Sequence, residues 1–369
     1  MKRICIVAGA RPNFVKIAPI IRTIKNTDGA SYELVYAGRE DDPTLEPSLF
    51  DDLQMPRPDV FLGVDSTSLN EITSRVMAQF DAYLDQAPAD VVIVVDDLAS
   101  TMAAAIVTKK RGLKLAHLVA GTRSFDMQMP KEVNRLVIDA LSDYLFTAGV
   151  RSNSVATREQ AEGANTYMVG NILMDTLRYN HQRLMKPQDL DLEPGSYLVF
   201  TLNRRALLAD EQKLRQLLQS MTEAADGTPI IAPMRSNAMN KVISLHLQPS
   251  TFNLQPSTLN LQPSTFNLHP PFSYLEFGWL TAHAKGIITD SGNVAEEATF
   301  NGVPCITLNS YTEHQETISV GTNVLVGEDP EKLAEEVKRM VAGQWKTAAL
   351  PDRWDGRTAE RIVQILCKQ

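Results

Sequence analysis

Short apolar runs alternate with amphipathic stretches along most of the chain. Runs of four or five apolar residues, as at residues 91–95, are typical of strands buried on both faces of a parallel sheet. Stretches with an apolar residue every three or four positions, as at residues 13–25, are typical of helices that cover such a sheet. In the first half the pattern predicts strands at residues 4–8, 32–37, 91–95, 115–119 and 144–148, and helices at 13–25, 70–84, 100–110 and 132–142.

A second series of the same kind follows Val169-Gly170-Asn171. Its segments are residues 172–181, 197–201, 209–225, 229–233, 275–284, 286–289, 293–300, 305–308 and 323–326. Repeated strand–helix–strand units predict an α/β protein with two doubly wound, Rossmann-like domains and a ligand cleft between them. The expected domains are residues 1–170 and 171–350, and residues 351–369 are expected to form a C-terminal helix that packs back on the first domain.

Residues 247–271 interrupt the second series with a seven-residue repeat, Leu-Gln-Pro-Ser-Thr-Phe-Asn. A proline in every copy excludes a coiled coil, because each proline removes a helix hydrogen bond. Low complexity and turn-forming residues predict an extended or disordered insertion that loops off the second domain. The alternative is a binding role for the repeat.

Composition excludes several classes of function. A formal net charge of -8 provides no basic field for nucleic acid. No apolar run approaches the roughly 20 residues that span a bilayer, and the N-terminus shows no signal-peptide pattern, so a cytoplasmic protein is expected. The cysteines Cys5, Cys305 and Cys367 are scattered and odd in number, which favours reduced thiols over disulfides or metal ligands.

Residues 286–297 carry the strongest local signal for binding. An apolar strand at 286–289 leads through a Ser-Gly turn into a predicted helix, and such a turn directs free N–H groups and a positive dipole end at an anion such as phosphate. Glu297 lies about one helical turn in, where a carboxylate can bind sugar hydroxyls. The alternative is a capped helix whose acids complement the dipole. A similar turn at Gly9 falls in the first half of the chain.

Several stretches taken together resemble the non-hydrolysing UDP-N-acetylglucosamine 2-epimerases. They are residues 9–19, 100–105, 120–124, 130–135, 169–171, 289–292, 296–297, 302–305, 312–313 and 355–363. The resemblance implies a fold similar to the two-domain nucleotide-sugar glycosyltransferases and interconversion of UDP-GlcNAc and UDP-ManNAc for surface polysaccharide supply. It also implies UDP-GlcNAc or a related UDP-sugar as ligand, a homodimer, and chemistry that needs no metal or other cofactor.

The resemblance implies roles for individual residues. Arg11 and Lys16 would neutralise the diphosphate, and the turn at Ser291 would bind it, although Asn293 replaces a glycine there. Glu297 would bind ribose, and the main chain of Phe277 would meet uracil. The full substrate-binding set is Arg11, Lys16, Asn203, Arg204, Phe277, Ser291, Gly292, Asn293, Glu297 and His314, and the catalytic set is Asp97, Glu132 and Arg135.

The catalytic motifs depart from the family pattern. Asp97 matches an acid of the family, but Val119 and Lys131 stand where the family has acids and Asn203 stands where it has a histidine. Other departures are Val95-Asp96, Gly38-Arg39-Glu40, Arg235-Ser236 and His314. Three readings therefore stay open. They are an epimerase of UDP-GlcNAc, an epimerase of a modified UDP-HexNAc with an acid set rearranged among Glu40, Asp96, Asp97 and Glu132, and a catalytically impaired UDP-sugar-binding homologue.

Overall fold

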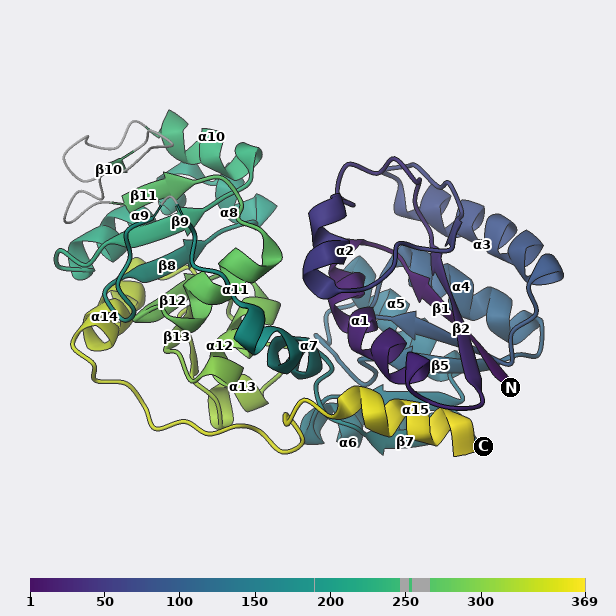
Figure 1. Cartoon of the computed structure of the whole chain (residues 1–369). Helices are drawn as coiled ribbons and strands as arrows, with labels where there is room; N and C mark the ends of the chain where they lie inside the picture. Colours follow the sequence, from purple (N-terminus) through teal and green to yellow (C-terminus); the bar gives the residue numbers. More distant parts are fainter. Residues whose placement is uncertain (189, 246–251, 254–265, 369) are drawn as a thin grey trace. The chain divides into compact units, whose positions relative to one another are not determined.

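The computed structural model describes residues 1–369 except 189, 246–251, 254–265 and 369 (Figure 1). The chain forms two compact units. Unit 1 comprises Met1–Tyr179 and Asp352–Gln369, and unit 2 comprises Asn180–Pro351. The sequence predicted a first boundary at residues 170/171, whereas the structure divides the chain after Tyr179, within helix α7 (Leu173–Asn180).

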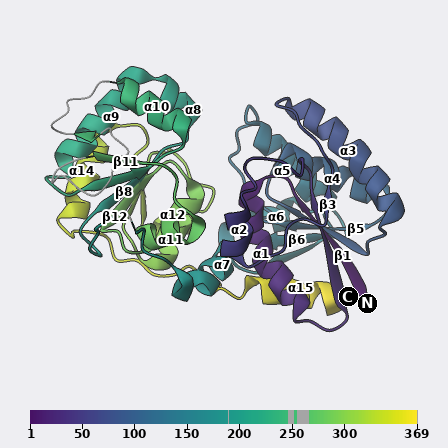
Figure 2. The same ribbon diagram turned by 45° about the horizontal axis from the view of Figure 1, so that its top comes forward.

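Unit 1 is a parallel sheet with strand order β3-β2-β1-β4-β5-β6-β7, and helices cover both of its faces (Figures 1 and 2). The strand order reverses between β1 and β4, the position where doubly wound sheets bind ligands. The strands are β1 (Lys2–Ala8), β2 (Ala30–Tyr36), β3 (Val60–Phe61), β4 (Val91–Val95), β5 (Lys114–Leu118), β6 (Tyr144–Thr147) and β7 (Asn165–Met168). The helices are α1 (Arg11–Lys25), α2 (Pro47–Leu53), α3 (Leu69–Gln86), α4 (Ala99–Lys110), α5 (Pro130–Leu141), α6 (Val150–Glu159), α7 and α15 (Thr358–Lys368).

The core of unit 1 follows from the apolar runs. All five residues of β4, Val-Val-Ile-Val-Val, are buried, because helices pack on both faces of this central strand. Helix α3 packs against α4 and α4 against α5, while α1 packs against α15. The short elements β3, α2, α6 and β7 were not predicted, because their few residues give too brief an apolar pattern.

Unit 2 is a second parallel sheet with strand order β10-β11-β9-β8-β12-β13-β14. Its strands are β8 (Leu198–Thr201), β9 (Ile230–Pro233), β10 (Phe252–Asn253), β11 (Phe266–His269), β12 (Gly286–Thr289), β13 (Cys305–Thr307) and β14 (Asn323–Leu325). Its helices are α8 (Arg205–Ala209), α9 (Glu211–Ala224), α10 (Ser236–Ser244), α11 (Tyr274–Ala282), α12 (Gly292–Asn301), α13 (Glu316–Ser319) and α14 (Pro330–Val341), with a 3-10 turn at His181–Arg183.

The end of the seven-residue repeat belongs to this sheet. Most of residues 247–271 lie outside the described part of the chain, but Phe266–His269 form β11, which is buried and pairs with β9. These residues are extended, but the prediction that they loop off the second domain was wrong. Phe266 and Leu268 alternate with polar residues and fill the core, a strand pattern that the surrounding low complexity obscured. Strand β10, which pairs with β11, comes from the Phe-Asn of an earlier copy.

The C-terminal segment folds onto unit 1. The Trp354 side chain is buried, and its indole N–H donates to the Ala148 carbonyl at 3.0 Å. The buried carboxylate of Asp175 in α7 accepts the backbone N–H groups of Thr358 and Ala359 at 3.1 and 2.8 Å. Asp175 therefore caps the N-terminus of α15 from a neighbouring helix.

We predict that the cap makes the stability of unit 1 depend on pH. Burial raises the pKa of Asp175 to about 6, although the two N–H groups act in the opposite direction. A raised folded-state pKa contributes stability below the ordinary value near 4, and this contribution is lost as the pH rises through about 6. The substitution Asp175→Asn removes this pH-dependent contribution to stability. Relative to the wild type, the variant should therefore gain about 2–3 kcal/mol in free energy of unfolding between about pH 4 and pH 7.

Urea unfolding of both proteins at the two pH values measures this change. At the lower pH, where Asp175 is protonated, the variant should be the less stable protein, because the amide NH2 group cannot accept the backbone N–H that the second oxygen of the carboxyl group accepts. If the free energies of unfolding of the two proteins changed equally between the two pH values, the prediction would be contradicted.

Candidate functional site

The first turn of α12 in unit 2 is open. Ser291 is the N-cap and has extended backbone angles, and its own N–H donates to Thr289 Oγ1 at 3.0 Å. Among the described residues no acceptor meets the backbone N–H of Gly292, Asn293 or Val294. Gly292 is exposed, so these donors and the positive end of the helix dipole are accessible to an anion.

Asp290 ties a second loop to this turn. Its Oδ2 accepts the backbone N–H groups of Asn203 and Arg204, which follow β8, at 2.7 and 2.5 Å. The Asn203 side chain is exposed beside the turn. The Arg204 guanidinium instead pairs with Glu328, its Nη1 lying 2.7 Å from Oε1, and the same carboxylate also binds Lys213. Asn203 and Arg204 are thus brought to the open turn, with Arg204 already ion-paired.

Two acids follow on α12. Burial and the charge of Glu296 raise the pKa of Glu297 to about 8, so Glu297 is largely protonated at neutral pH. A protonated carboxyl group both donates and accepts hydrogen bonds, which suits sugar hydroxyls. Buried Glu296 faces His314, with 3.5 Å between Oε1 and Nε2. The structure therefore brings Glu297, Glu296 and His314 together beside the helix.

Phe277 lies in α11, and its partly buried ring packs against the core beneath α12. Its backbone N–H donates to the Ser273 carbonyl at 2.9 Å, and its own carbonyl accepts Thr281 Oγ1 at 3.0 Å. These main-chain bonds are internal to the helix and its cap. Contact between this main chain and uracil therefore stays a prediction.

The corresponding turn of unit 1 is closed. The amide oxygen of Asn13, at the third position of α1, accepts the backbone N–H groups of Gly9 and Ala10 at 2.9 and 3.2 Å. Asn13 Nδ2 donates in turn to Asp96 Oδ2, and Lys16 Nζ lies 2.5 Å from Asp96 Oδ1. Lys16, which the resemblance assigned to a diphosphate, is thus ion-paired within unit 1, and its role and that of Arg11 stay predictions. Arg11 is half-buried at the start of the same helix.

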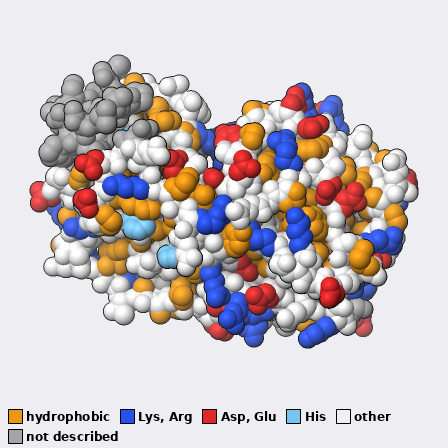
Figure 3. Space-filling view, in the orientation of Figure 1, with side chains coloured by type: hydrophobic (Ala, Val, Ile, Leu, Met, Phe, Trp, Pro, Cys, Tyr) orange, Lys and Arg blue, Asp and Glu red, His pale blue; other side chains and the backbone are white. Residues whose placement is uncertain are grey.

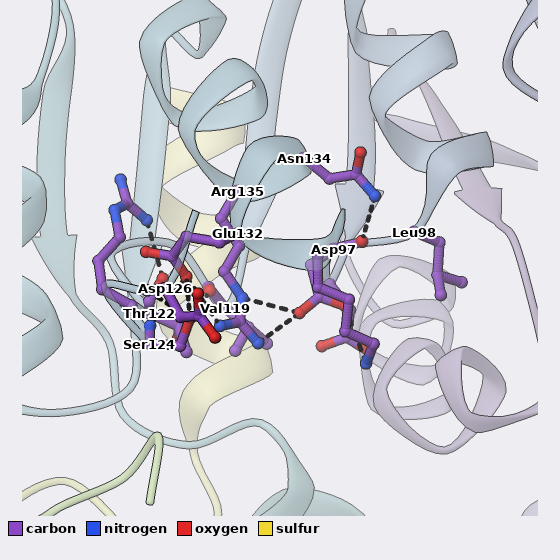
Figure 4. Close-up of polar contacts among 12 residues, drawn as sticks. Asp97, Leu98, Val119, Thr122, Ser124, Asp126, Glu132, Asn134 and Arg135 are labelled. Carbon is purple, nitrogen blue, oxygen red and sulfur yellow. Dashed lines mark hydrogen bonds and ion pairs between the residues drawn. The ribbon is translucent and has the colours of Figure 1, made fainter. Parts of the chain in front are cut away.

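The three residues predicted to be catalytic lie together (Figure 4). Asp97 follows β4, and its Oδ2 binds Arg135 Nε at 2.8 Å and Nη2 at 2.6 Å. Lys131 Nζ lies 3.3 Å from Oδ1 and is 56% exposed. Burial acts to raise the pKa of Asp97, but the charges of Lys131 and Arg135 outweigh it and hold the pKa below its ordinary value. Asp97 is therefore ionised at neutral pH.

Glu132 has a different role from Asp97. It is buried in the first turn of α5, and its carboxylate accepts Ser124 N and Oγ at 2.8 and 2.9 Å and Phe125 N at 3.1 Å. Arg135 Nη1 lies 3.2 Å from the same carboxylate. These bonds outweigh desolvation and lower the pKa of Glu132. These contacts fix the loop after β5, and a catalytic role for Glu132 stays a prediction.

Sequence reasoning missed a second buried acid on α5. Asp139, two turns after Glu132, has His117 Nδ1 at 2.5 Å, the Gly121 N–H at 3.0 Å and the Arg123 guanidinium at 2.7 Å. The opposing charges of His117 and Arg123 outweigh burial and lower the pKa of Asp139. The seven-residue spacing of Glu132 and Asp139 on one helix face was the available signal.

Two departures from the family pattern have left-handed backbones. Asp96 has a φ of 58° and Val119 a φ of 73°, although β-branched residues rarely adopt positive φ. Figure 4 shows Val119 beside Glu132 and Arg135. At this edge an apolar side chain therefore stands where the family resemblance predicts an acid.

The described residues hold no group of three or more His, Cys, Asp or Glu side chains arranged for a metal ion. Within the same residues, no helix has the length and apolar character needed to cross a bilayer. On the face of the molecule seen in Figure 3, acidic and basic side chains are interspersed. This charge pattern offers no extended basic surface on that face.

We predict that Gly292→Asp weakens UDP binding at least tenfold, because a carboxylate at the first position of α12 repels the diphosphate. A Cβ built at Gly292 meets no atom within 4 Å, so the change fits sterically. Gly292→Ala is the matched control and should bind UDP within about twofold of the wild type. Calorimetric titration with UDP measures both, and equal affinities for the two variants would contradict an anion site at this turn.

The chain matches the UDP-N-acetylglucosamine 2-epimerase family model over residues 22–367. It is 30% identical over 378 residues to a UDP-N-acetylglucosamine 2-epimerase of Methanocaldococcus jannaschii, covering 99% of this chain and 98% of that protein. A UDP-2,3-diacetamido-2,3-dideoxy-D-glucuronate 2-epimerase of Pseudomonas aeruginosa is 28% identical over 373 residues, with 99% of each chain covered. The crystal structure of the M. jannaschii UDP-GlcNAc 2-epimerase in complex with UDP-GlcNAc and UDP aligns over 100% of both chains, with a TM-score of 0.84 and 29% identity. The resemblance seen in the sequence is confirmed, and this chain belongs to the UDP-N-acetylglucosamine 2-epimerase family.

Proposed function

We propose that this protein is a UDP-N-acetylhexosamine 2-epimerase that interconverts UDP-GlcNAc and UDP-ManNAc. The open first turn of α12, with protonated Glu297 one turn further on, carries the proposal. This arrangement suits a diphosphate joined to a ribose. The M. jannaschii relative, whose structure holds UDP-GlcNAc and UDP, supports the choice of ligand.

The proposed reaction is an elimination followed by an addition. A base removes the proton on C2 while the bond between C1 and the UDP oxygen breaks, which leaves a C1–C2 double bond and free UDP. UDP then adds back to C1 as a proton returns to the opposite face of C2. The sum is an isomerisation, and it needs a base, a proton donor and a firm hold on UDP.

The side chains of each unit fit separate parts of this reaction. In unit 2, the N–H groups of α12 would hold the diphosphate and stabilise its charge as the C1–O bond breaks. In unit 1, ionised Asp97 is the candidate base. Lys131 is the accessible cation beside it, and Arg135 positions Asp97 by two hydrogen bonds.

A second candidate substrate is favoured by Lys131. This lysine places a cation in the first turn of α5, against the helix dipole, where the family resemblance predicts an acid. An ammonium group there complements a sugar carboxylate. The P. aeruginosa relative is named for a UDP-linked diacetamido glucuronate. An acidic UDP-sugar of that class is therefore the alternative to UDP-GlcNAc. The homodimer implied by the resemblance and the cytoplasmic location expected from the sequence remain part of this proposal.

Proton NMR of UDP-GlcNAc with the purified protein in deuterated water tests the proposed reaction. We expect the C2 proton signal to decay as deuterium exchanges in, and signals of the manno isomer to grow. Line broadening without exchange would indicate a UDP-sugar-binding protein without this activity. The same experiment with an acidic UDP-sugar would then decide between the two substrate classes.

We predict that restoring the family's groups increases turnover of UDP-GlcNAc. The triple change Val119→Glu, Lys131→Glu and Asn203→His should raise kcat at least tenfold, because acid and base groups supply roughly 10²–10⁴-fold in such reactions. Val133→Glu, at an exposed position of α5, is the control for an added acid and should leave kcat unchanged. A lower kcat in the triple variant would indicate that the native set serves another substrate.

A further inference from the structure

Phe125 is held in a conformation that the folded protein does not need for packing. Its φ is 61°, in the left-handed region that bulky residues rarely adopt, and its side chain is 59% exposed. A strained backbone and an aromatic ring in water both cost stability. Such costs persist where function selects the conformation, and they concentrate at ligand sites.

The surrounding residues determine this conformation from two sides. Buried Glu132 accepts the N–H groups of Ser124 and Phe125 at 2.8 and 3.1 Å. Two turns along the same face of α5, Asp139 accepts the Gly121 N–H and pairs with the guanidinium of Arg123. Both ends of residues 121–125 are therefore fixed by buried acids of one helix. The backbone that carries the Phe125 side chain is therefore held in place.

The loop that carries Phe125 lies next to the candidate catalytic cluster. The backbone of Phe125 bonds to Glu132, Glu132 pairs with Arg135 at 3.2 Å, and Arg135 binds Asp97 at 2.6 Å. Figure 4 shows the residues on either side of Phe125, Ser124 and Asp126, beside Glu132 and Arg135. A sugar with C2 near Asp97 would lie within reach of this loop.

We propose that Phe125 is a specificity-determining residue whose ring packs against the methyl group of the substrate's acetamido substituent. The inference rests on the proposed function and adds a contact to it. An aromatic face binds apolar C–H groups, and the acetamido methyl is the main apolar group of an N-acetylhexosamine. Val119, at the start of the same loop, adds a second apolar side chain at this edge.

A sugar suits this surface better than a protein partner. A specific protein interface covers roughly 800 Å² on each side. The exposed apolar side chains of the described loop and the start of α5 are those of Phe125, Met127 and Val133. This small apolar surface beside a buried charge cluster is about the size of a monosaccharide. An N-acetylhexosamine has both polar hydroxyls and one methyl group to accommodate.

Calorimetric titration of the full-length protein with UDP, UDP-glucose and UDP-GlcNAc tests the proposal. UDP-glucose has a hydroxyl in place of the acetamido group. Phe125→Ala should weaken UDP-GlcNAc binding about tenfold and leave the other two ligands within about twofold. Met127→Ala, which removes a neighbouring side chain that is 63% exposed, is the control and should leave all three affinities unchanged.

The variant Phe125→Gly distinguishes the effect of losing the ring from the effect of backbone strain. Glycine adopts positive φ without strain, so this variant should melt at a higher temperature than Phe125→Ala and show the same loss of UDP-GlcNAc affinity. Equal weakening of UDP and UDP-GlcNAc by Phe125→Ala would mean that the ring supports the loop, which overturns the proposal. No change in UDP-GlcNAc affinity would overturn it as well.

If Phe125→Ala sediments differently from the wild type but binds all three ligands equally well, the ring contacts a second copy of the chain. This result would overturn the proposal. Failure of the wild-type protein to bind UDP-GlcNAc would overturn the proposed function and this inference together. Wild-type binding with an unaffected Phe125→Ala variant would overturn this inference alone. The two failures are therefore distinguishable in one set of titrations.

Discussion

The ion pair between Asp97 and Arg135 joins the end of β4 to α5 at the carboxyl edge of the unit 1 sheet. Arg135 is buried and binds two acids, Asp97 at the end of β4 and Glu132 on its own helix. Burying these charges is costly, and the cost is met only while every partner is present. Glu132 in turn fixes the loop after β5. The position of that loop therefore depends on a guanidinium that does not belong to it.

The fold class was predictable from the sequence and is confirmed by the structural relatives, because long apolar runs such as that of β4 have few other interpretations. The polar contacts were harder to predict from the sequence. Lys16 and Asp96 are 80 residues apart in sequence and meet because β1 and β4 are neighbours. The family resemblance assigned Lys16 to a diphosphate. Only the three-dimensional structure shows the carboxylate that pairs with it.

The two strand–turn–helix units show why a glycine turn is an incomplete indicator of an anion site. Both begin a helix directly after a buried parallel strand. In the first, the amide of Asn13 reaches back and satisfies the N–H groups of Gly9 and Ala10. In the second, the N-cap N–H of Ser291 binds Thr289 Oγ1, while the N–H groups of Gly292, Asn293 and Val294 meet no acceptor among the described residues. The polar side chains around each turn thus determine which of its donors are satisfied within the protein.

The seven-residue repeat that supplies β11 also bears on how this segment can evolve. Phe252-Asn253 of β10 and Phe266-Asn267 of β11 are the same dipeptide from copies two repeats apart, and they pair in register. Tandem copies in a gene expand and contract by slippage during replication. Loss or gain of one whole copy upstream would leave an identical Leu-Gln-Pro-Ser-Thr-Phe-Asn unit leading into the buried strand. The length of this segment can therefore drift between generations while the residues of β11 in the core stay the same.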